Sequence, residues 1–118
     1  MIFNAHTLAR SWLSVALAQS DDSGRPALYR TTLIETFPTG VRLVSTDSYL
    51  ILKAWVPSSM WADSPEPEAD ELPEEVAICR DVDHRVLGLM KYALKLCGKQ
   101  GVEANLRLRR GVGDAPMA

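Results

Sequence analysis

The pattern of apolar and polar residues predicts an amphipathic helix near the start of the chain. Its apolar positions recur at the three- and four-residue spacing of one helix face: Leu8, Trp12, Val15 and Ala16. Asn4 or Thr7 can cap its first turn. We therefore predict a helix that runs to about Gln19, preceded by a short strand at residues 1–4 and followed by a polar loop.

A second amphipathic helix is predicted at about residues 82–97. Its apolar stripe is formed by Val82, Val86, Leu89, Ala93 and Leu96. Asp81 can cap this helix, and Gly98 or Gly101 can end it. Three lysines repeat every four residues on another face: Lys91, Lys95 and Lys99.

The segment between the helices alternates with the two-residue period of β-strands. Arms at residues 28–37 and 41–56 flank a turn, and Asp47 and Ser48 break the second arm, which predicts a long hairpin with a kink. Further strands are predicted at residues 75–80 and 102–110. The predicted order is β-α-β-β-β-α-β, an α+β domain in which two helices pack on one face of a largely antiparallel sheet.

Composition adds a charge asymmetry to this picture. Residues 1–118 form one predicted domain, with an acidic, proline-rich loop at residues 58–75. This loop holds seven acidic residues: Asp63, Glu66, Glu68, Asp70, Glu71, Glu74 and Glu75. Without them the chain keeps 13 basic and 8 acidic residues, so its body is mildly basic and suits a polyanionic partner. A solvated acidic loop on an ordinary domain is the alternative interpretation.

The sequence contains little that indicates catalysis. It has no P-loop, GxSxG or HExxH motif, and its two histidines and two cysteines lack the close spacing of zinc ligands. We expect no enzyme activity, cofactor or metal, although sequence alone leaves open a nucleophile at Cys79 or Cys97. No apolar run approaches the roughly 20 residues that cross a membrane, and the N-terminus lacks a secretory pattern. A cytoplasmic protein with reduced thiols is expected.

Binding to nucleic acid fits the pattern better, because a phosphate backbone requires several cations on one surface. Five residues are candidates: Arg10, Arg25, Lys91, Lys95 and Lys99. The three lysines equally suit an ordinary solvated helix face. Trp61, beside the acidic loop, is either an exposed anchor or a lid on the core.

Three short motifs follow one another at a characteristic spacing. Gly24-Arg25-Pro26 precedes the first hairpin arm, Thr46-Asp47 follows the apolar run of the second arm, and Val76–Arg80 leads into the second helix. In this order the motifs resemble one repeat of the bacterial DNA sliding clamp, the beta subunit of DNA polymerase III. The start at Met1 and the Gly-Arg-Pro motif make the chain most similar to the N-terminal repeat of that family.

The resemblance implies a DNA clamp fold in which repeats close into a ring, so a homo-oligomer is expected. It implies a processivity factor of DNA replication that holds duplex DNA through its helix face without sequence preference. A DNA polymerase and a clamp loader are the implied partners. Arg25 matches a family position that contacts DNA, and Thr46 and Tyr49 fall where partner-binding residues are expected.

The chain departs from the family in two places. Ser48-Tyr49-Leu50 stands where a middle clamp repeat has Gly-His-Arg, and fewer strands follow the second helix than a clamp repeat has. We therefore expect either a fragment of a longer clamp or a shortened clamp-like protein. The alternative function is a protein-interaction module or adaptor that does not encircle DNA.

Overall fold

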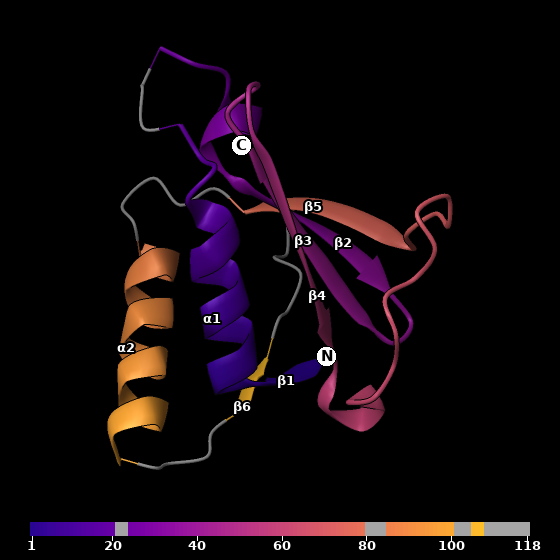
Figure 1. The fold of residues 1–118 in the computed structure, drawn as a ribbon, viewed down its shortest axis with the longest axis vertical. Helices are drawn as coiled ribbons and strands as arrows, with labels where there is room; N and C mark the ends of the chain where they lie inside the picture. Colours follow the sequence, from indigo (N-terminus) through magenta and orange to yellow (C-terminus); the bar gives the residue numbers. More distant parts are fainter. Residues whose placement is uncertain (21–23, 80–84, 101–104, 108–118) are drawn as a thin grey trace, which may run out of the picture.

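The computed structural model describes residues 1–20, 24–79, 85–100 and 105–107 (Figure 1). Its elements in chain order are β1 (Ile2–Asn4), α1 (Ala5–Ala16), the 3-10 helix η1 (Ala27–Arg30), β2 (Thr32–Phe37), β3 (Gly40–Thr46), β4 (Ile51–Pro57), the 3-10 helix η2 (Ser59–Trp61), β5 (Glu75–Cys79), α2 (Arg85–Gln100) and β6 (Asn105–Arg107). The predicted cap Asp81, the stop Gly101 and most of the predicted last strand lie outside the described residues.

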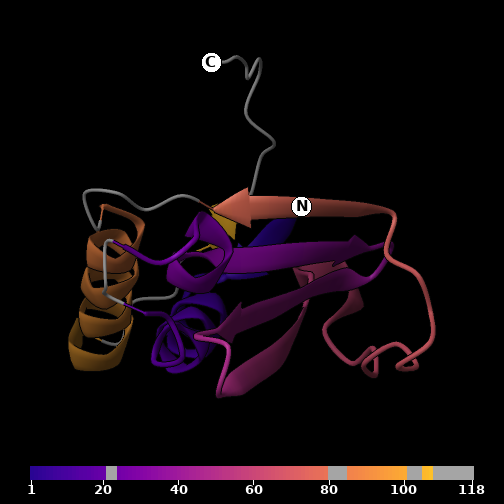
Figure 2. The same cartoon turned by 90° about the horizontal axis from the view of Figure 1, so that it is seen from above.

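Four strands form an antiparallel sheet in the order β4-β3-β2-β5. β1 and β6 form a separate antiparallel ribbon, with Phe3 opposite Leu106. The fold is thus an α+β domain with an antiparallel sheet, as predicted. α1 contacts β2, β3 and β4, whereas the main contact of α2 is α1. In both views α1 stands between α2 and the long strands β3 and β4 (Figures 1 and 2).

The core lies between α1 and the inner face of the sheet, and α2 closes it from the side. The largest contributions come from Phe3, Leu8, Trp12, Val15, Val41, Leu43, Val56 and Met90, all of them buried. Along β3 the alternation turns Val41 and Leu43 toward the helices and Arg42 toward the outer face. The sheet therefore has an inner face that packs on α1 and an outer face whose contacts are made by the loop after β4.

The break at Asp47 and Ser48 is a chain reversal, so the predicted kink within one strand is wrong. β3 and β4 are separate strands that pair antiparallel with each other. The Oδ1 atom of Asp47 accepts hydrogen bonds from the backbone N–H groups of Tyr49 (2.9 Å) and Leu50 (2.8 Å), and Ser48 adopts a positive φ of 82°. This local bonding closes a tight turn. Two-residue alternation is the same in a kinked strand and in two strands joined by a turn, so the pattern did not distinguish them.

The first helix is shorter than predicted. α1 ends at Ala16, and the backbone N–H of Gln19 bonds back only three residues, to the carbonyl of Ala16 (3.0 Å). The Gln19 side chain donates instead to the buried Oγ1 of Thr32 (2.7 Å). Tertiary bonding to β2 thus replaces the last helical turn. Residues 28–30, predicted as the start of a strand, belong instead to η1, which follows Pro26.

The buried side of α2 shares Val86 and Ala93 with the predicted stripe but includes Met90 in place of Leu89. Met90 and Ala93 are buried, and Val86 and Cys97 are partly buried against the core. Leu89, predicted to lie in the stripe, is 50% exposed. Leu89 and Met90 are neighbours in α2 and differ by about 100° around the helix axis. Each is three or four residues from both Val86 and Ala93, so a stripe through either residue contains Val86 and Ala93. The apolar pattern alone fits both stripes.

Candidate nucleic-acid interface

The two helices carry positive charge and no acidic residue. α1 contains Arg10, and α2 contains Arg85, Lys91, Lys95 and Lys99. The side chains of Arg10, Lys91 and Lys95 are exposed and make no ion pair with another described residue. The side chain of Lys99 lies outside the described residues, although its backbone continues α2.

Lys91 and Lys95 lie on the side of α2 that is turned away from the core. They are one helical turn apart, about 6 Å along the axis, and opposite the buried Met90 and Ala93. Their ammonium groups therefore reach solvent from the same side of the helix. Arg10 is exposed on α1, on the side opposite the buried Leu8 and Trp12.

The acidic loop lies at the opposite end of the domain. Residues 62–74 follow η2 and run along the far side of the sheet from α1 and α2, as both views show (Figures 1 and 2). The charge asymmetry of the sequence is thus a spatial segregation, with cations on the helices and carboxylates at the other end. A polyanion is attracted to the helix side and repelled from the loop side.

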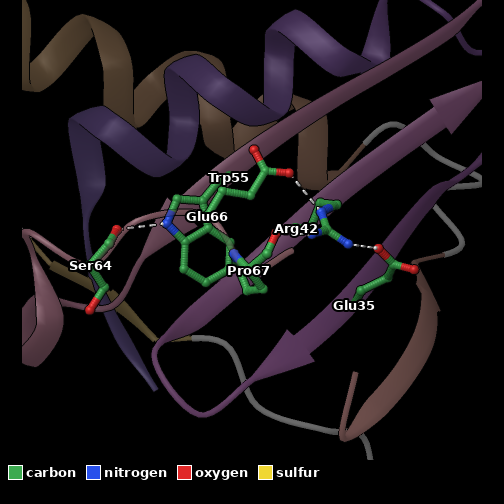
Figure 3. A network of polar contacts seen from close by, with 6 residues as sticks. All are labelled: Glu35, Arg42, Trp55, Ser64, Glu66 and Pro67. Carbon is green, nitrogen blue, oxygen red and sulfur yellow. Dashed lines mark hydrogen bonds and ion pairs between the residues drawn. The ribbon is translucent and has the colours of Figure 1, made fainter. Parts of the chain in front are cut away.

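Arg42 fastens the acidic loop to the outer face of the sheet (Figure 3). Its side chain is buried, and Nε donates to Glu66 (3.0 Å) while Nη1 donates to Glu35 (3.1 Å). Nη2 donates to the backbone carbonyl of Pro67 (3.1 Å), and the guanidinium lies 5.0 Å from the centre of the Phe37 ring. One arginine thus joins β2, β3 and the loop.

A second contact holds the start of the loop. Nε1 of Trp55 donates to the backbone carbonyl of Ser64 (3.1 Å), and the Trp55 ring meets Phe37 edge-on at 5.9 Å. Sequence reasoning missed Arg42 because a basic residue in the outward register of a strand normally faces solvent. The available signal was the run of seven acidic residues, which lacks a basic residue of its own.

Arg25, predicted to contact DNA, lies with the β3–β4 turn and not on the helices. Its Nη2 donates to the backbone carbonyl of Asp47 (2.7 Å) and to Oγ of Ser48 (2.5 Å). The guanidinium also lies 5.0 Å from the ring centre of Tyr29 and 5.9 Å from that of Tyr49. Arg25 therefore stabilises the turn.

Thr46 and Tyr49, predicted to bind partners, belong to the same turn as the contacts of Arg25. Oγ1 of Thr46 accepts a hydrogen bond from the backbone N–H of Ser48 (3.0 Å). The Tyr49 side chain is 89% exposed at the tip of the hairpin. The structure therefore brings together Arg25, Thr46 and Tyr49, which the sequence had assigned to two different roles, and separates them from Lys91 and Lys95.

Replacing Asp47 by asparagine should remove part of the acid sensitivity of the domain. The pKa of Asp47 is lowered because the backbone N–H of Tyr49, and then that of Leu50, donates to the carboxylate. A carboxyl group with a lower pKa in the folded state stabilises the fold above its usual value of 3.8 and loses this contribution as the pH falls further. In Asp47→Asn the side-chain oxygen still accepts both bonds but does not titrate. The difference in melting temperature between wild type and Asp47→Asn should narrow from about pH 7 to about pH 3, and an unchanged difference would contradict this assignment.

Comparison with protein-family models gave no match, and neither did comparisons with curated proteins and with solved structures. Among the residues that the structure describes, no group of three or more His, Cys, Asp or Glu side chains is placed to hold a metal ion. Neither described helix is long and apolar enough to cross a membrane.

Proposed function

We propose that this domain binds duplex DNA without sequence preference through the outward side of α1 and α2, as one repeat of a clamp-like processivity factor, and that it catalyses no reaction. The observation that carries the proposal is the segregation of charge between the helices and the acidic loop. The replication role, and a polymerase and clamp loader as partners, rest on the motifs shared with the sliding-clamp family.

Lys91 and Lys95 suit a contact that tolerates sliding. Lysine is a flexible point charge, and each ammonium that meets a phosphate releases a condensed counterion without reading a base edge. These lysines make no ion pair with another described residue, so no such ion pair has to break before DNA binds. The acidic loop orients the domain on DNA, because its carboxylates repel the phosphates and so favour an approach with the helix side toward the duplex.

Neutralising the lysines of α2 should flatten the salt dependence of DNA binding. In Lys91→Gln/Lys95→Gln/Lys99→Gln, the slope of log K against log salt should fall by up to about three units, at roughly 0.9 per lost phosphate contact. The measurement is the affinity for a short duplex at several salt concentrations. Lys53→Gln is the matched control, because Lys53 is equally exposed but lies on β4 and points to the outer face of the sheet. An unchanged slope in the triple variant would refute the DNA-facing assignment of α2.

An adaptor that docks on another protein is the second candidate, and an exposed apolar cluster favours it. Met60 and Trp61 in η2 are 86% and 52% exposed, and η2 contacts the N-terminal strand β1, whose Ile2 is 40% exposed. Trp61 is therefore an exposed side chain and not a lid on the core. An apolar patch beside carboxylates suits a partner with an apolar anchor and basic residues. Retention on circular DNA with loss from linear ends supports the clamp, and equal release from both supports the adaptor.

A further inference from the structure

The outward side of α2 carries apolar side chains that binding to phosphates does not require. Leu89 and Tyr92 are 50% and 63% exposed, and they adjoin on the helix surface because they are three residues apart. Tyr92 is also three residues from Lys95, and both Lys91 and Lys95 are exposed. Phosphates need only the ammonium groups. An exposed apolar pair beside cations suits a protein segment that has an apolar side chain among carboxylates.

A segment of this chemistry lies within the acidic loop, at residues 68–72, and is called the acidic turn below. Leu72 is 85% exposed, and Glu68, Asp70 and Glu71 are exposed beside it. The backbone N–H of Glu71 donates to the carbonyl of Glu68 (3.0 Å), which closes a tight turn. None of these three carboxylates makes an ion pair with a described residue. The acidic turn therefore presents one apolar side chain flanked by negative charge.

The acidic turn cannot reach α2 of its own chain, because contacts fix it on both sides. Before the turn, Arg42 donates to Glu66 and to the backbone carbonyl of Pro67. After the turn, the backbone N–H of Glu74 donates to the carbonyl of Thr36 (2.7 Å). The loop lies on the far side of the sheet from α1 and α2 (Figure 2). So short a segment, bound at both ends, cannot span the sheet and α1, and contact with α2 requires a second copy.

We propose that the acidic turn of one copy docks on the outward side of α2 of a second copy. Leu72 then packs against Leu89 and Tyr92. The carboxylates of the turn pair with Lys91 and Lys95, so opposite charges surround a small apolar contact. Each copy keeps one acidic turn and one α2 side unused, so the contact is head-to-tail and further copies can add. It involves neither edge of the sheet.

Docking of the acidic turn would cover the lysines to which we assign DNA. Self-association and DNA binding then exclude each other at Lys91 and Lys95, and the acidic turn competes with phosphates for the same charges. This competition rests on the proposed function, whereas the docking does not. The experiments below are made without DNA, so self-association can fail while DNA binding stands, and the reverse.

Native mass measured against concentration tests the contact. At about 50 mM salt the mean mass should rise above one chain with a dissociation constant of about 0.1 mM, and about 500 mM salt should abolish the rise. Lys91→Glu/Lys95→Glu and Asp70→Lys/Glu71→Lys should each stay single chains, because like charges then meet. Their equimolar mixture should associate, since opposite charges meet again. Lys53→Glu, at an exposed lysine on β4, is the control and should associate like wild type.

A matched pair of apolar substitutions tests the placement of Leu72. Leu72→Ser should raise the dissociation constant about tenfold, because the apolar contact is lost, whereas Met60→Ser should leave it unchanged. The two side chains are 85% and 86% exposed, so neither change should affect folding. A wild-type mass of one chain up to about 1 mM at low salt would overturn the inference. So would association that persists in Lys91→Glu/Lys95→Glu, or a Leu72→Ser variant that associates as strongly as wild type.

Discussion

Replacing Gly40 by alanine should lower the free energy of unfolding by about 3 kcal/mol, because the added methyl group has no room. A Cβ at Gly40 would overlap the backbone carbonyl of Val56 and lie 2.7 Å from Cα of Pro57 and 2.9 Å from Cη2 of Trp55. Two of these neighbours are backbone atoms of β4, so relief requires separating β3 from β4. The backbone at Gly40 is not left-handed, and the cost is therefore steric and not conformational.

Gly88→Ala is the matched control for this substitution. Gly88 lies within α2, and a Cβ there meets no atom within 4 Å. The same chemical change should raise stability by about 0.5–1 kcal/mol, since alanine loses less backbone entropy in a helix. Chemical denaturation of the two variants should give shifts of opposite sign. Equal, small effects would show that β3 and β4 approach less closely at Gly40 than the structure indicates.

The helices, the strands and the charge asymmetry could be predicted because each depends on a local period or a local composition. Leu8, Trp12 and Val15 define one face of α1 whatever the rest of the chain does. The antiparallel pairing of β2 with β3 follows from the short connection between them. Lys91 and Lys95 are exposed, and their role in DNA binding stays a prediction.

The sequence did not predict features that depend on contacts between distant residues. The turn at Asp47 depends on which strand β3 pairs with, and alternation carries no such information. The position of Arg25 depends on Tyr29 and Tyr49, which close around its guanidinium from separate segments. The acidic loop could be predicted as a loop, but its attachment could not, because Arg42 reaches Glu66 across 24 positions of the chain.

Arg42→Ala should destabilise the domain by about 3 kcal/mol and release the acidic loop. Removing one partner of a buried ion pair leaves the other charge desolvated, which costs about 3–5 kcal/mol. The lower end applies here, since Glu35 is 22% exposed and Glu66 is 52% exposed. Glu66→Gln should cost less than about 1 kcal/mol, because its carboxylate is already half in water. Denaturant unfolding gives both values, and limited proteolysis within residues 62–74 reports the release of the loop.

A double-mutant comparison separates two costs of losing Arg42: the Glu35 carboxylate left without its partner, and the lost packing. Arg42→Met keeps an apolar stem against the Phe37 ring but leaves the Glu35 carboxylate without its partner. Adding Glu35→Gln removes that charge, so Arg42→Met/Glu35→Gln should regain about 1–2 kcal/mol over Arg42→Met alone. If the double variant is no more stable than Arg42→Met, the unpaired Glu35 carboxylate is not what destabilises Arg42→Met. The role of Arg42 would then lie in its bonds to Glu66 and Pro67, and proteolysis of the loop should increase equally in both variants.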